Sequence, residues 1–169
     1  MKIKTENSTT TTDPFAALYR SFAEKGLPIP APLELMSASK PLFEVFRTYL
    51  GHYVSNPSLS PKLLACIRYA VAHRSDFDAC IAFNREVLSL HGIQKELALL
   101  EKAECHAVLD DRDSRIFHLA MDAIFHPDKV TEERLAQMKH HDISEQTLFE
   151  AAYHGAMLLA TGPLVRAFG

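Results

Sequence analysis

Two proline-containing helix starts restrict the fold of this chain more than any other feature. Asp13-Pro14 and Ser60-Pro61 each place a residue that favours the N-cap before a proline in the first helical turn. An apolar run with helical spacing follows each pair. Proline is tolerated in the first turn because its missing N–H would have no partner there. Both segments are therefore predicted to be helices that begin at a defined residue.

Together with similar signals elsewhere, these starts divide the chain into about eight helices joined by short loops. The expected ranges are 13–26, 32–38, 40–55, 61–74, 75–92, 94–106, 111–126, 131–141 and 144–160. Ser75 and Asp78 resemble a capping box for the fifth of these. Gly162-Pro163 should break or kink the last one, because an internal proline removes a backbone donor. No strand-like alternation of useful length occurs, so we predict an all-α fold.

Length and charge exclude several classes of protein. The chain has 169 residues, with 18 basic and 21 acidic side chains, which gives no general attraction for nucleic acid or anionic membranes. The polar tract 5–12 predicts a disordered tail over residues 1–12, followed by a single domain over 13–169. The first residues lack the apolar run of a secretory signal, so we expect a cytoplasmic protein. The apolar stretch Ala151–Val165 is too short to span a bilayer and is expected to be a buried or interface helix.

The cysteines and histidines do not form a recognisable metal or disulfide pattern. Cys66, Cys80 and Cys105 are odd in number and widely spaced, so they are expected to be thiols. The nine histidines include the adjacent pair His140-His141, whose side chains point in different directions on a helix, with His126 and His118 as the other candidates. No HExxH or paired CxxC motif accompanies them. We therefore expect neither a metal ion nor another cofactor.

One face of the predicted helix 75–92 should point inward. Its members recur at steps of three and four residues and include one thiol and one amide: Phe77, Cys80, Ile81, Asn84, Val87, Leu88 and His91. This face places Cys80 and Asn84 in the interior, where polar groups require partners.

The segment 59–93 resembles the central part of the alkylhydroperoxidase D and carboxymuconolactone decarboxylase superfamily. The stretch from Leu59 to His73 is similar to the helix that precedes the active site in that family. The family signature is Glu, eleven spacers, Cys, two spacers, Cys, three spacers, His, with a glycine turn eight residues later. Gly92 and Cys80 together fix the register of this chain. Looser similarity extends over residues 27–169 and implies a helical bundle with a central antiparallel helix pair.

The register leaves one of the four signature residues in place. Cys80 corresponds to the second cysteine, whereas the first is replaced by Phe77, the glutamate by Ala65 and the histidine by Asn84. By resemblance, Cys80 is the candidate catalytic residue. Phe77 cannot serve as a resolving thiol, and no general base remains at the family's positions.

Cys80 is therefore expected to be a poor nucleophile. Asp76 and Asp78 lie close in sequence, and a nearby carboxylate disfavours the thiolate. Two interpretations of Cys80 stay open: a small buried apolar side chain, or a retained redox or nucleophilic residue. Cys66 follows the Ala65 position by one residue and so points about 100 degrees away from it, which argues against a new Cys66–Cys80 disulfide.

Small-molecule binding is the alternative use of this region. Tyr69 and His73 lie one and two helical turns after Ala65, so Tyr69 could line one cavity with Cys80 and Asn84. The candidate substrate-binding residues are Tyr69, His73, Phe77 and Asn84. A plain alternative is that Tyr69 and Asn84 only satisfy buried hydrogen bonds.

Three functions follow from these patterns. The first is a peroxidase-related protein of antioxidant thiol peroxidase ancestry whose redox site is degenerate or altered. The second is a decarboxylase-like or isomerase-like enzyme acting on a small organic acid, which Arg68 or His73 facing a pocket would favour. The third is a non-catalytic, ligand-binding homo-oligomer, since proteins similar to this one assemble as trimers or hexamers.

Overall fold

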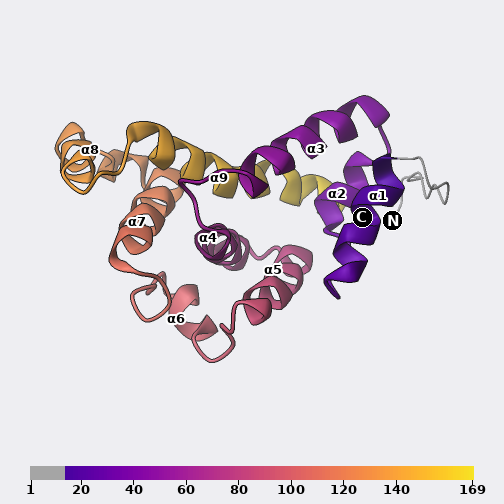
Figure 1. The fold of residues 1–169 in the computed structure, drawn as a ribbon, viewed down its shortest axis with the longest axis horizontal. Coiled ribbons are helices and arrows are strands. Elements are labelled where there is room, and N and C mark those ends of the chain that lie inside the picture. The colour runs from indigo at the N-terminus through magenta and orange to yellow at the C-terminus, as the bar shows by residue number, and fades with distance from the viewer. Residues whose placement is uncertain (1–13) are drawn as a thin grey trace. The chain divides into compact units, whose positions relative to one another are not determined.

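The computed structural model describes residues 14–169, and this part of the chain is entirely helical. It contains nine α-helices and one 3-10 helix and no strand. Figure 1 shows the helices in chain order. The prediction of an all-α fold is confirmed. The predicted disordered tail, residues 1–12, lies outside the described residues.

The chain divides into two compact units, and the first contains the N-terminal helices. Within the described residues it comprises 14–55 together with Thr161–Gly169. Its helices are α1 (Pro14–Glu24), α2 (Ala31–Met36) and α3 (Lys40–Val54). The rings of Phe15 and Phe43 pack with centroids 3.8 Å apart, and both side chains are buried. An aromatic contact between the first and third helices thus forms part of this unit's core.

The second unit, Asn56–Ala160, contains every residue of the predicted site. Its elements are α4 (Pro61–Arg74), α5 (Asp78–Leu90), α6 (Leu97–Glu101), α7 (Asp111–Phe125), the 3-10 helix η1 (Pro127–Lys129), α8 (Glu132–Lys139) and the first part of α9 (Glu145–Phe168). The prediction of a single domain over 13–169 stays a prediction.

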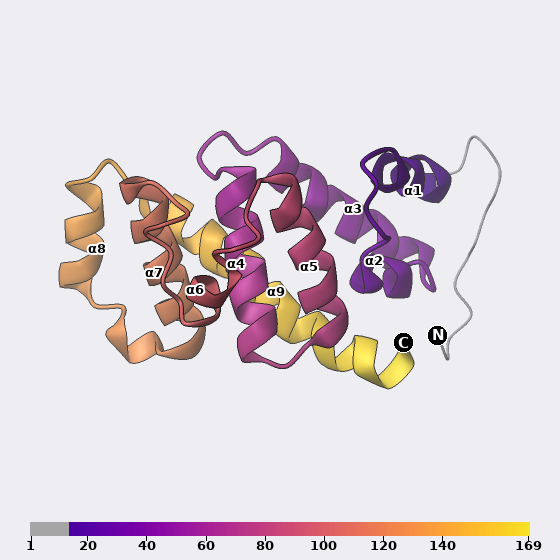
Figure 2. The same ribbon diagram turned by 90° about the horizontal axis from the view of Figure 1, so that it is seen from below.

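Helix α4 is the centre of the second unit. Nine of its 14 residues are buried, which explains why its apolar side chains occur on all sides rather than on one stripe. Figure 1 looks along α4 and shows α5, α6 and α7 around it. Helices α4 and α5 lie side by side and run in opposite directions, joined by the three residues 75–77 (Figure 2). This pair is the central antiparallel helix pair that the sequence predicted.

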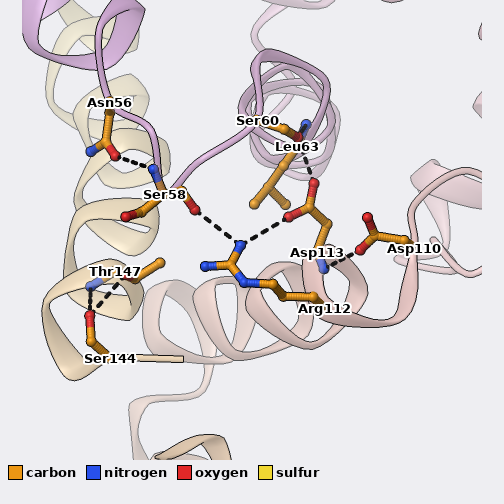
Figure 3. A network of polar contacts seen from close by, with 9 residues as sticks. All are labelled: Asn56, Ser58, Ser60, Leu63, Asp110, Arg112, Asp113, Ser144 and Thr147. Atoms are coloured by element: carbon orange, nitrogen blue, oxygen red, sulfur yellow. Dashed lines mark hydrogen bonds and ion pairs between the residues drawn. The ribbon is translucent and has the colours of Figure 1, made fainter. Parts of the chain in front are cut away.

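A polar network fixes the N-terminus of α4 against that of α7 (Figure 3). The Ser60 hydroxyl accepts a hydrogen bond from the Leu63 amide, 3.0 Å away, and donates one to Asp113 Oδ2, 2.5 Å away. The Asp113 amide in turn donates to the Asp110 carboxylate at 2.8 Å. Ser60 and Asp110 are therefore the N-caps of two helices, and Asp113 joins them.

The turn between α4 and α5 differs from the predicted capping box. The Phe77 amide donates to the Ala72 carbonyl at 3.0 Å while Asp76 adopts a φ of 54°, which is the Schellman pattern at a helix C-terminus. Ser75 is consequently the C-cap of α4, and α5 begins only at Asp78. The capping-box prediction is wrong, because the residues that would have opened α5 are used to end α4.

The end of α5 agrees with its sequence signal. Gly92 has a φ of 75°, and the Ile93 amide donates to the Leu88 carbonyl at 3.0 Å. This is a second Schellman turn, with glycine in the left-handed conformation that it adopts at little cost. The predicted helix end near Gly92 is confirmed, and the length of α5 is set by it.

Two other helices differ in length from the prediction. Helix α6 is five residues long because Ala103 takes a positive φ of 59° and the Glu104 amide bonds back to the Leu99 carbonyl. Helix α9 continues through Pro163 to Phe168, so the expected break there does not occur. None of the helices in residues 14–169 combines the length and apolar character that a bilayer span requires.

Candidate functional site

Cys80 lies in the first turn of α5, buried against α4. The Schellman turn at Asp76 delays the start of α5 to Asp78, so Cys80 is its third residue. The side chain is 4% exposed. Burial raises the pKa of the Cys80 thiol above its ordinary value, and the positive charge of Arg68 opposes that rise with a smaller effect. The raised pKa agrees with the expectation of a poor nucleophile, but its cause is burial rather than the carboxylates of Asp76 and Asp78.

Asn84 is held by hydrogen bonds on both sides of its amide. Its Nδ2 donates to the Cys80 carbonyl oxygen at 2.7 Å, and its Oδ1 accepts from Arg68 Nε at 3.2 Å. Only 1% of the residue is exposed. The side chain at the position of the family histidine therefore connects the α5 backbone to α4, and an amide has no proton-accepting nitrogen with which to act as a base.

A histidine that the sequence pattern did not single out completes this group. His154 on α9 is 4% exposed. Burial lowers the pKa of His154 well below its ordinary value of 6.5, and Arg68 lowers it further. The imidazole is therefore neutral at neutral pH. We call Arg68, Cys80, Asn84 and His154 the Arg68 cluster, because the guanidinium donates to Asn84 and its charge acts on the other two.

Tyr69 and His73 make their polar contacts with a different group. The Tyr69 hydroxyl donates to Glu101 Oε1 at 2.8 Å, and His73 Nε2 lies 3.8 Å from Glu101 Oε2. Burial and the bond to Glu101 raise the pKa of Tyr69, whereas the guanidinium of Arg85 lowers it. Because successive helical residues point about 100 degrees apart, Tyr69 and Arg68 face different neighbours.

The predicted site residues thus fall into separate groups. Cys80 and Asn84 lie in the Arg68 cluster, while Tyr69 and His73 lie at Glu101. Phe77 is the N-cap residue of α5 and is 8% exposed. A cavity shared by Tyr69, Cys80 and Asn84 stays a prediction.

Sequence reasoning missed Glu101 and gave His154 no role. Glu101 is the last residue of the short helix α6. This helix ends at a positive φ of Ala103, which no local sequence motif predicts. His154 did carry a signal, since it interrupts an otherwise apolar stretch. A titratable side chain inside an apolar run either reaches solvent or is buried, and burial of its charged form is costly. His154 is buried.

Other cysteines and histidines of the second unit lie outside these two groups. Cys66 on α4 is fully buried, and burial raises its pKa to about 12. His126 Nε2 lies 2.8 Å from the guanidinium of Arg74, and His140 and His141 are exposed at the end of α8. Over residues 14–169, no three side chains of the ligand type converge to hold a metal ion as they stand.

No protein-family model matches the sequence, and no curated protein matches it significantly.

Proposed function

We propose that this chain is a divergent member of the alkylhydroperoxidase D-like superfamily in which Cys80 no longer turns over hydroperoxides. The observation that carries the proposal is the Arg68 cluster, in which Cys80 is buried beside an amide and a cation. The central antiparallel pair α4–α5 and the Gly92 turn are compatible with the superfamily.

Peroxide reduction by a thiol needs three conditions that Cys80 does not meet. The sulfur must attack the peroxide oxygen as a thiolate, which releases an alcohol and leaves a sulfenic acid. Burial instead keeps this thiol protonated. A base must accept the thiol proton, yet Asn84 occupies the adjacent position with both ends of its amide bonded. A second thiol must then attack the sulfenic acid and release water, but Phe77 stands there.

Peroxide consumption with a dithiol as reductant tests this proposal. We expect the wild type and Cys80→Ser to show equal, negligible rates, with Cys105→Ser as the matched control for loss of another buried thiol. A wild-type rate that disappears in Cys80→Ser but persists in Cys105→Ser would contradict the proposal.

A second candidate function is an enzyme that acts on a small organic acid. Arg68 favours it, because a guanidinium is suited to binding a carboxylate. A thermal-shift screen of small carboxylates tests this candidate. Stabilisation of the wild type that is absent in Arg68→Gln would support it, and equal responses of the two proteins would argue against it.

Assembly into homo-oligomers also remains a proposal, supported by one exposed aromatic pair. Phe149 and Tyr153 lie one turn apart on α9, are 68% and 45% exposed, and stack with centroids 6.0 Å apart. Large apolar side chains gathered on one face of a helix are typical of protein contacts.

A further inference from the structure

The short helix α6 ends in a backbone conformation that is unfavourable for alanine. The Glu104 amide donates to the Leu99 carbonyl at 2.8 Å and the Ala103 amide to the Leu100 carbonyl at 3.0 Å, so a Schellman turn follows α6. Ala103 has a φ of 59°, where a β-carbon approaches the following carbonyl oxygen. Elsewhere in residues 14–169, positive φ is confined to glycines and aspartates: Gly26, Asp76, Gly92 and Asp142. Alanine has neither the freedom of glycine nor a polar side chain that could bond locally.

The start of α6 has a second unfavourable feature. Glu96 is the N-cap residue of α6, but its side chain makes no cap hydrogen bond. Its Oε2 atom is buried and has no hydrogen-bond partner within the described part of the chain. A buried polar atom without a partner has lost its hydration and gained nothing in return. Both ends of α6 therefore weaken the native arrangement of this segment.

Few contacts hold α6 in place beside α4 (Figure 1). Leu100 is the one buried residue among its five, whereas nine of the 14 residues of α4 are buried. The other anchor is the Glu101 carboxylate, which accepts the hydrogen bond from the Tyr69 hydroxyl at 2.8 Å. A helix of this length is not stable without such contacts. Segments with few buried contacts open at a lower free energy than the core of the same protein.

We propose that residues 96–105 form a strap that opens as a unit while α4, α5 and α7 stay folded. In the closed state Tyr69 and Cys105 are fully buried. Opening breaks the bond between Tyr69 and Glu101 and exposes the Tyr69 hydroxyl and the Cys105 thiol to solvent. The strap thus controls access to the face of α4 that carries Tyr69.

Labelling of the native wild type with iodoacetamide tests the strap, because a buried thiol reacts only when its surroundings open. Each rate is divided by the rate of the same thiol in the unfolded chain. Cys66 is fully buried in α4 and reports the opening of the core. We expect Cys105 to label roughly tenfold faster than Cys66 or more, with a smaller urea dependence because less surface is exposed. Equal relative rates of the two thiols, or equal urea dependence, would overturn the proposal.

Two variants that relieve the unfavourable features should close the strap. Ala103→Gly removes the β-carbon at the positive φ, and Glu96→Met removes the unpartnered oxygen at similar side-chain length. Each should slow Cys105 labelling severalfold, since each stabilises the closed state relative to the open one. An unchanged Cys105 rate in both variants would overturn the proposal.

Asp142→Gly is the matched control for the backbone change. Asp142 has a φ of 55° in the turn after α8, which stays folded when the strap opens. This variant should therefore leave the Cys105 rate at the wild-type value, and slowing as large as that of Ala103→Gly would overturn the proposal. None of these outcomes bears on the function proposed for Cys80.

Discussion

At the scale of single residues, one guanidinium influences three side chains of different chemistry. Arg68 donates to the Asn84 amide, opposes the burial effect on the Cys80 thiol, and adds to the burial effect on His154. For both titratable neighbours, desolvation is the larger influence. The cluster therefore has one fixed charge surrounded by groups that are neutral at neutral pH.

The neutral state of His154 predicts loss of stability in acid. Its folded-state pKa lies below the unfolded value of 6.5, so the unfolded chain binds more protons between those two values. The contribution is fully present above pH 6.5 and is lost as the pH falls toward the folded pKa, by up to about 1.4 kcal/mol per pH unit. Urea unfolding as a function of pH should show a shallower acid slope for His154→Gln than for the wild type.

The comparison with a second variant isolates the effect of His154. Burial also lowers the pKa of His118, so part of the slope must remain in His154→Gln. His140→Gln, at an exposed position, should reproduce the wild-type slope. Parallel slopes for the wild type and His154→Gln would show that His154 is not held neutral.

At the scale of helices, α9 lies close to α4 and α7 at Gly155. A Cβ there would lie 2.7 Å from Ile124 Cδ1 and 2.8 Å from Ile67 Cγ2. Such distances require the neighbouring side chains to move. The lack of a side chain at this position lets three helices of the second unit pack together.

Gly155→Ala should therefore destabilise the protein. Overpacking a core contact typically costs about 1–3 kcal/mol. Gly51 in α3 is the matched control, because a Cβ there meets nothing within 4 Å and alanine favours helix by about 0.5–1 kcal/mol. Urea unfolding should give opposite signs for the two variants. A Gly155→Ala protein as stable as the wild type would contradict this packing.

The cap of α4 gives a second prediction at this scale. Ser60→Ala removes both the bond to the Leu63 amide and the bond to Asp113, and loss of an N-cap alone costs about 0.5–2 kcal/mol. Thr131→Ala removes one exposed cap bond of 3.3 Å from α8 and should cost less. The free energies of unfolding of both variants, measured side by side, check this order, and the reverse order would refute it.

Three helix starts with a side-chain cap were predicted correctly, whereas the ends of α6 and α9 were not. Ser60, Thr131 and Ser144 are N-caps because a side-chain oxygen next to an unpaired amide is a local interaction. The end of α6 depends on a positive φ at Ala103. Helix α9 continues through the exposed Pro163, although proline there lacks a backbone donor. Such outcomes are decided by tertiary packing, which local sequence does not contain.

At the scale of the whole molecule, the sequence predicted the all-α class but not the grouping of the site residues. Periodicity placed Cys80 and Asn84 on the inner face of α5, and both are buried. The sequence did not predict that Tyr69 contacts Glu101 whereas the charge of Arg68 acts on His154. Glu101 and His154 belong to helices that are distant from α4 in the chain. Which helix covers which face of α4 is determined by packing.

The exposed aromatic pair gives a prediction about assembly. Light scattering at micromolar concentration should report a species larger than the monomer, and Phe149→Glu should shift it toward the monomer. Val54→Glu, which changes another exposed apolar side chain, is the control. A monomeric wild type would argue against the oligomer.

The ionisation of Cys80 tests the central claim most directly. Each cysteine lies in a different tryptic peptide, so brief iodoacetamide labelling of the native wild type over a range of pH, followed by mass spectrometry, reports each thiol without mutation. We expect Cys80 to label more slowly than in the unfolded chain, with a midpoint above its ordinary pKa of 9.0. Rapid labelling with a midpoint below that value would mean that the Arg68 cluster activates this sulfur, and it would contradict the claim that Cys80 has lost its reactivity toward peroxides.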